Sequence, residues 1–146
     1  MQSCHLLPLV QILVASVLLH FFVEIADTAG LISKGLSGRI SMPEHAGMLF
    51  VFPEEDIRTF WMKGMRFPLD FIWIGNDCKV VDLTENVVVD TNQEELNIYN
   101  SSQPAEFNFE VNAGEIRLSN IQIGDIVQFK NIDVDCLLYT SDAADE

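Results

Sequence analysis

Alternation of apolar and polar residues along the chain predicts a set of short β-strands. FFVEIA (21–26) alternates in this way, whereas GMLFVF (47–52) is a continuous apolar run closed by Pro53, as expected of a strand buried on both faces. In EFNFEVN (106–112), Phe107, Phe109 and Val111 alternate with polar residues, so we expect one buried face and one wet face.

Further strand patterns fill the rest of the chain, at 58–63 (RTFWMK), 70–74 (DFIWI), 79–83 (KVVDL), 86–90 (NVVVD) and 126–130 (IVQFK). Two intervals fit short helices: one capped by Asp27 or Thr28 and ended by Gly38, the other within 114–121. Seven or eight short strands with one or two short helices predict a mainly β fold, a small antiparallel sandwich or a partly open barrel. The expected core includes Phe50, Phe52, Phe71, Phe107, Phe109 and Val111.

The stretch FWMKGMRFPLDFIWIG (60–75) places charged residues inside an otherwise apolar segment. Gly64 and Pro68 favour a turn, and a hairpin with its corner near Met65 would bring Lys63 close to Asp70. Two interpretations stay open. The pair is a turn-capping ion pair, or Trp61, Lys63 and Asp70 edge a ligand cleft to which Arg39, Glu110 and Asn112 contribute.

Composition bounds the possible functions. A chain of 146 residues with 49% hydrophobic residues and ten Phe fits one globular domain. The net charge of −14 repels phosphate backbones, so we expect no nucleic-acid partner.

Both ends of the chain stand apart from the predicted domain at 21–130. Residues 1–20 are apolar and contain no Lys or Arg, so they fit an export signal or membrane anchor without the usual basic start, or a mis-called start; we favour the export signal. Residues 131–146 form a remnant, of which CLLYTSDAADE (136–146) resembles the translation of a sequencing-library adapter. Without Cys136, only Cys4 and Cys78 remain, which predicts no disulfide framework and a surface position for Cys78.

Five blocks together resemble the domain-of-unknown-function 192 family: GLSGR (35–39), GMLFVF, FWMKGMRFPLDFIWI, PAEFNFEVNAG (104–114) and IQIGDIVQF (121–129). The resemblance covers about Val23 to Lys130. Gly64 departs from it, because many members carry Asn there. It implies a compact β-rich domain, often behind a signal or anchor, with no established activity.

No motif for a metal, a phosphate loop or a nucleophile elbow is present in the sequence, so we expect no cofactor and no metal site. The favoured function is a non-catalytic extracytoplasmic module, monomeric, that binds a small molecule, glycan or envelope protein; any membrane contact would be through the N-terminal segment. The alternative is an enzyme with Asp70 or Glu110 as general base and Lys63 or Arg39 stabilising an anion.

Overall fold

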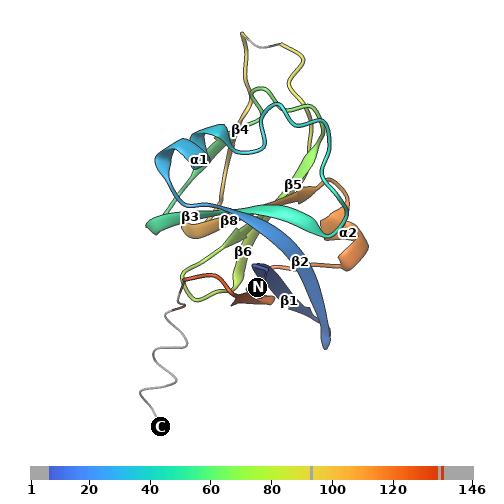
Figure 1. The fold of residues 1–146 in the computed structure, drawn as a ribbon, viewed down its shortest axis with the longest axis vertical. Helices are drawn as coiled ribbons and strands as arrows, with labels where there is room; N and C mark the ends of the chain where they lie inside the picture. The colour runs from blue at the N-terminus through green and yellow to red at the C-terminus, as the bar shows by residue number, and fades with distance from the viewer. Residues whose placement is uncertain (1–6, 93, 135, 137–146) are drawn as a thin grey trace, which may run out of the picture.

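The computed structural model describes residues 7–92, 94–134 and residue 136, in which nine strands and two short helices form one β-rich body (Figure 1). The elements are β1 (Leu9–Val14), β2 (Val17–Ala26), α1 (Ala29–Lys34), β3 (Ala46–Asp56), β4 (Thr59–Trp61), β5 (Leu69–Ile74), β6 (Val80–Val87), β7 (Ile98–Asn100), β8 (Ala105–Asn112), α2 (Glu115–Ser119) and β9 (Ile126–Lys130).

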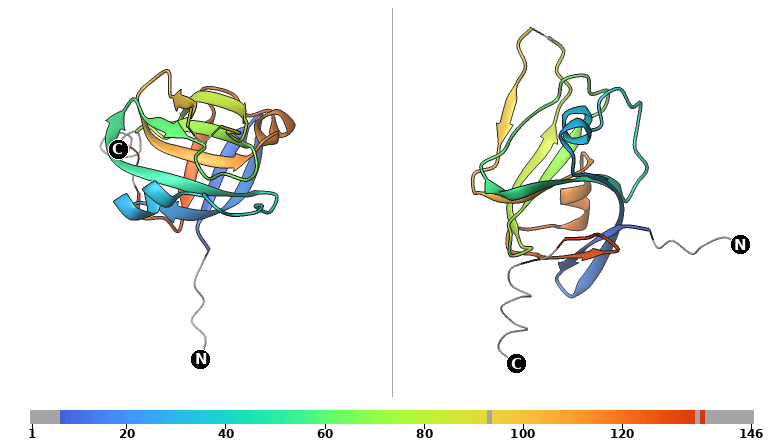
Figure 2. Two further views of the ribbon diagram at one scale, coloured as in Figure 1. Left: turned by 90° about the horizontal axis from the view of Figure 1, so that it is seen from above. Right: turned by 60° about the vertical axis from the view of Figure 1, so that its left-hand side comes forward.

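Seven strands form one curled sheet in the order β6-β5-β8-β3-β2-β1-β9, and β4 pairs with β7 in a separate two-stranded sheet. Every neighbouring pair of the large sheet is antiparallel except β2 and β3, which are parallel. The sheet bends until its two edges approach each other (Figure 2). The two edges are joined along a short stretch only, by a bridge between Lys79 and Ile126 and a hydrogen bond from Val127 N to Cys78 O (2.8 Å). The fold is therefore a partly open barrel, one of the two architectures that the sequence predicted.

Hydrophobic side chains pack on both faces of the central strands. On the concave face, Leu49, Ile72 and Phe109 belong to one cluster, while Phe50 and Trp73 belong to a second cluster on the opposite face. This confirms the two-sided burial predicted for 47–52. Of the six expected core residues only Phe52 is half-buried, because it lies where β3 leaves the centre of the sheet.

The predicted wet face of residues 106–112 is wrong. Asn108 is fully buried and Glu110 is only 5% exposed. Both lie on the face of β8 opposite to Phe109, and residues from α1, β4 and β7 cover that face. The alternating pattern correctly placed the side chains on two faces, but the covering elements come from distant parts of the chain.

Helix α1 begins where the sequence predicted, because the Thr28 side chain accepts a hydrogen bond from Leu31 N at 3.2 Å. It ends at Lys34 rather than near Gly38, since Gly35 adopts a positive φ of 49° as the C-cap. The second helix, α2, lies within the interval predicted for it.

The sheet begins before residue 21, where we expected the domain to begin. Strand β1 and the first part of β2 pair with each other from Leu9 to Phe22, and β1 also pairs with β9. Among the described residues, none of the helices has the length and hydropathy needed to cross a membrane. An export role for residues 1–20 stays a prediction.

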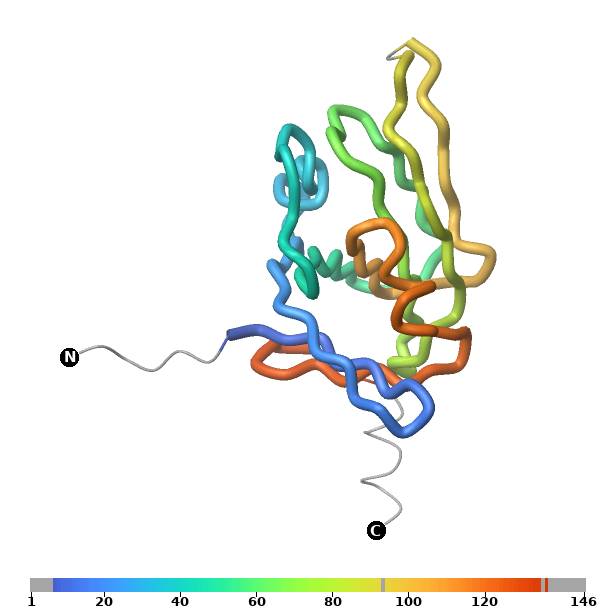
Figure 3. The backbone as a smooth tube through the Cα atoms, turned by 90° about the vertical axis from the view of Figure 1, so that its right-hand side faces the viewer, coloured from blue at the N-terminus to red at the C-terminus, as the bar shows by residue number. Residues whose placement is uncertain are grey.

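A disulfide joins Cys78 to Cys136, which corrects the expectation of no disulfide. Cys78 is 2% exposed rather than at the surface, because the turn that carries it packs into the concave cluster. Residues 88–92 and 94–97, between β6 and β7, extend away from this body (Figure 3).

Candidate functional site

The hairpin predicted between residues 58–63 and 70–74 does not form. Strand β4 pairs with β7, and Trp61 lies opposite Ile98. Asp70 belongs to β5 in the large sheet, opposite Val111 of β8. Lys63 and Asp70 are therefore not cross-strand neighbours, and they are not among the ion pairs of the described residues. The sequence pattern showed a turn between two strands but could not show that the first strand pairs with a distant segment.

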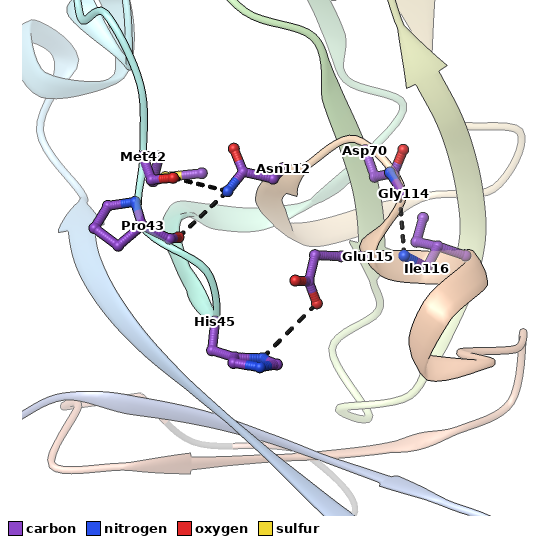
Figure 4. A network of polar contacts seen from close by, with 8 residues as sticks. All are labelled: Met42, Pro43, His45, Asp70, Asn112, Gly114, Glu115 and Ile116. Atoms are coloured by element: carbon purple, nitrogen blue, oxygen red, sulfur yellow. Dashed lines mark hydrogen bonds and ion pairs between the residues drawn. The ribbon is translucent and has the colours of Figure 1, made fainter.

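Asp70 is a buried structural carboxylate. Its Oδ1 accepts a hydrogen bond from Asn86 N at 2.8 Å, and its Oδ2 accepts from Gly114 N and Ile116 N, both at 3.0 Å. The donor Asn86 joins β5 to the end of β6, and the other two donors join β5 to the first turn of α2, as Figure 4 shows. With its oxygens occupied by backbone N–H groups, Asp70 holds the fold rather than facing a cleft.

Asn112 fixes a neighbouring loop. Its side-chain amide donates to the carbonyl oxygens of Met42 (2.9 Å) and Pro43 (3.3 Å). In the same region His45 Nδ1 lies 3.9 Å from an oxygen of the buried Glu115 (Figure 4). Asn112 therefore positions residues 42–45 against β8.

Arg39 lies in a two-pronged ion pair with Glu24. Its Nη1 and Nη2 donate to the two carboxylate oxygens, the second at 2.9 Å. The hydrogen bond from Arg39 holds the pKa of Glu24 below its usual value. Arg39 thus ties the loop after α1 to β2.

A cleft of about 500 Å³ opens between α1, the β4–β7 pair and the large sheet. Its apolar lining includes Ile32, Leu36, Phe50, Phe52, Ile57, Phe60, Trp61, Met62, Met65, Leu69 and Ile98. Its polar lining consists of Ser33, Lys34, Ser37, Arg58, Thr59 and Glu110.

Glu110 is a buried carboxyl group in this cleft. Its cross-strand partners are Met48 and Phe71, both apolar. Its hydrogen-bond partner among the described side chains is Asn108, whose amide nitrogen lies 3.5 Å from Oε2, a long contact. Burial raises the pKa of Glu110 to about 8, so at neutral pH most molecules carry it protonated.

Two cations stack against aromatic rings that line the cleft. Lys63 Nζ lies 5.5 Å from the centroid of the Trp61 ring, and the Arg58 guanidinium lies 4.3 Å from the centroid of the Phe52 ring. Arg58 also donates a hydrogen bond to Glu54 O. Trp61 is 52% exposed, so its ring is accessible to a ligand.

The loop after α1 docks on the turn after β4. Ser37 Oγ donates to Lys63 O (3.0 Å), and Gly38 N donates to Gly64 O (2.9 Å). Gly64 has a φ of +75°, a region that glycine adopts freely and Asn tolerates better than most residues. The loop contacts hold one wall of the cleft together.

Of the six residues predicted for a site, Trp61 and Glu110 line the cleft together. Arg39, Lys63, Asp70 and Asn112 are not among its lining residues. Sequence reasoning missed Ser33, Arg58 and Phe60. Arg58 and Phe60 lie in the same sequence segment as Trp61, and their charge and aromatic ring were the signal that could have identified them. No local sequence pattern indicated that α1 would pack beside the cleft.

Comparison with known proteins gives a family and a fold. The model of a family described as "Uncharacterized ACR", the domain-of-unknown-function 192 family, matches residues 11–129. A crystal structure described as a "putative transcription regulator" from Sinorhizobium meliloti 1021 is similar, with 27% identity, 90% of this chain and 100% of that chain covered, and a TM-score of 0.79. A protein of unknown function from Novosphingobium aromaticivorans DSM 12444 is 29% identical over 82% of this chain and 83% of that chain, with a TM-score of 0.76. A search of curated proteins found no match.

Proposed function

For this chain, which belongs to the domain-of-unknown-function 192 family, we propose that it is a non-catalytic module that binds a small molecule in the cleft between α1 and the sheet. The observation that carries the proposal is Glu110, a carboxyl group that is 5% exposed and lines that cleft. Burial of an ionisable group without a strong partner costs stability, and such groups concentrate at functional sites.

The remaining lining suits a ligand of modest size. A volume of about 500 Å³ lies within the range of small-molecule sites, which combine apolar walls with a few polar groups. Phe60 packs edge-on against Phe50, with 5.0 Å between centroids, and this packing holds the apolar wall in place. The wall is therefore largely formed before a ligand arrives.

A nucleic-acid ligand is not part of the proposal. The description of one structural neighbour as a "putative transcription regulator" concerns that protein. Here the net charge is −14, which opposes approach to a phosphate backbone.

A second candidate, an enzyme, is favoured by one observation. The pKa of about 8 for Glu110 suits a general acid or base working near neutral pH. Of the two bases considered from the sequence, Glu110 is the one that lines the cleft. In this version Arg58 or Lys34, rather than Lys63 or Arg39, would face a developing anion, because both line the same cleft.

Ligand-observed NMR on the full chain tests the binding function with a library of small aromatic fragments. The variant Ser33→Trp places an indole on the exposed side of α1, where Ser33 lines the cleft. The control Leu118→Trp adds the same ring on α2 at a residue that is 85% exposed and outside the cleft lining.

We expect fragments that bind the wild type to lose their signal with Ser33→Trp and to keep it with Leu118→Trp. If every fragment responds equally to the two variants, the cleft is not the binding site. Chemical conversion of a bound fragment, lost in Glu110→Gln, would favour the enzyme instead.

A further inference from the structure

The surroundings of Glu110 contain no cation within ion-pair distance among the described residues. Its neighbours across the strands are the apolar side chains of Met48 and Phe71, and its hydrogen bond to Asn108 is long. A carboxyl group in this position can still form a strong interaction with a group brought by a ligand.

Four aromatic residues contribute to the lining of the cleft that contains this carboxyl group. Phe50, Phe52, Phe60 and Trp61 all line the same cleft as Glu110. The faces of aromatic rings attract cations, and this attraction grows where water is excluded. A cleft that combines a buried carboxyl group with several aromatic rings is thus suited to an organic ammonium group, which combines charge with an apolar body.

We propose that the ligand carries an organic ammonium group and that Glu110 receives this group in the cleft. The proposal rests on the binding function proposed above and specifies the ligand's chemical class. The negative net charge of the chain, −14, also favours the approach of a cation over that of an anion.

Binding of an ammonium group changes the protonation of Glu110. Burial alone keeps the carboxyl protonated at neutral pH, whereas an adjacent cation stabilises the carboxylate. The proton leaves Glu110 for the solvent, and no covalent bond forms or breaks in the ligand. Complex formation at pH 7 therefore releases about one proton per ligand.

Two cations of the protein line the same cleft and would favour an anionic ligand instead. Lys34 lies on the exposed side of α1, and Arg58 is stacked on Phe52 and donates to Glu54 O. If these two groups dominate recognition, a carboxylate ligand binds best. The test of the proposal therefore compares the binding of a cationic ligand with that of an anionic ligand.

Three probes share a phenylethyl body and differ in their polar group: 2-phenylethylamine, 2-phenylethanol and 3-phenylpropionate. Trp61 fluorescence reports their binding, because Trp61 lines the cleft while Trp73 is fully buried away from solvent. The variants are Glu110→Gln, which keeps the shape but cannot ionise, and Glu44→Gln, an exposed control outside the cleft lining.

We expect the amine to bind at least about tenfold more tightly than the alcohol, and Glu110→Gln to remove that preference, since a hydrogen bond to a charged group contributes this much. Calorimetry in two buffers of different ionisation enthalpy should show proton release for the amine alone. The control Glu44→Gln should behave as the wild type.

Equal or tighter binding of the alcohol or the propionate would overturn the ammonium proposal and leave the binding function standing. The ammonium proposal also fails, with the binding function intact, if the amine's preference survives in Glu110→Gln. If no probe binds the wild type more tightly than it binds Ser33→Trp, the ammonium proposal fails and the cleft itself is in question, which the fragment library then decides separately.

Discussion

The carboxylate of Asp70 accepts a hydrogen bond from the backbone N–H of Ile116 at 3.0 Å, across 46 positions of the chain. The same oxygen accepts from Gly114, and the other oxygen accepts from Asn86. One side chain thus closes the first turn of a helix and holds the end of a strand. This structural role explains why Asp70 stands inside the apolar segment 60–75.

Replacing Asp70 by Asn should lower the free energy of unfolding by about 3 kcal/mol or more, because hydrogen bonds to a charged group contribute about 1.5–3 kcal/mol each. An amide cannot accept at both ends, so at least one backbone N–H loses its partner inside the protein. Chemical denaturation measures the change. The control Asp27→Asn, at an exposed position, should leave stability within about 0.5 kcal/mol. A neutral Asp70→Asn would show that these contacts do not hold the fold.

Glu110 should make stability depend on pH. The unfolded carboxyl ionises near its ordinary pKa of 4.5, whereas the folded one keeps its proton to about pH 8. Between these values the folded state binds more protons, so stability falls as pH rises from about 4.5 to about 8 and then levels off.

The difference between wild type and Glu110→Gln isolates this effect, and over that interval it should grow to the order of 3–5 kcal/mol in favour of the variant. Denaturation curves at several pH values measure it, with Glu44→Gln as the exposed control. Parallel pH profiles for wild type and Glu110→Gln would contradict the raised pKa.

Phe109→Ala should cost about 3–5 kcal/mol, the range for truncating a buried aromatic residue. Phe109 is fully buried and packs edge-on against Phe21, with 5.3 Å between ring centroids. The matched change Phe22→Ala, at a residue that is 55% exposed, should cost less than about 1 kcal/mol because little buried area is lost. Equal costs for the two variants would invalidate the assigned faces of the sheet.

Two glycine substitutions should act in opposite directions. A Cβ on Gly47 would lie 2.5 Å from both Glu110 O and a Phe109 ring carbon, so Gly47→Ala should destabilise the protein by about 1–3 kcal/mol. A Cβ on Gly30, in α1, would meet no atom within 4 Å. Gly30→Ala should therefore stabilise the protein by about 0.5–1 kcal/mol. Thermal unfolding of both variants checks the signs, and a tolerated Gly47→Ala would mean that β3 and β8 can move apart.

Removing residues 136–146 should leave cooperative unfolding intact, because the strands of the described chain end at Lys130. The loss of the Cys78–Cys136 cross-link should lower stability by about 2–4 kcal/mol, and Cys136→Ser in the full chain should reproduce that loss. If the truncated chain unfolds non-cooperatively while Cys136→Ser still unfolds cooperatively, the fold depends on the removed segment through more than the cross-link.

Local pattern predicted the strands better than their partners. The run at 47–52 predicts a doubly buried strand because its hydrophobicity has no alternation, and residues 47–50 of β3 are buried on both faces. Residues 106–112 alternate, yet Asn108 and Glu110 are buried under elements brought by long-range pairing. The contact expected between Lys63 and Asp70 failed for the same reason: β4 pairs with β7, a strand from a later part of the chain, rather than with the strand that follows it.

The pairing of β1 with β9 has a consequence for biosynthesis. Leu9 of β1 lies opposite Lys130 of β9. During synthesis β1 therefore leaves the ribosome early, but its second edge is paired only after β9, the last described strand, has been made. Contacts between segments so distant in sequence close large loops and slow folding. During translation the nascent chain therefore carries an unpaired strand edge, a surface that chaperones shield from aggregation.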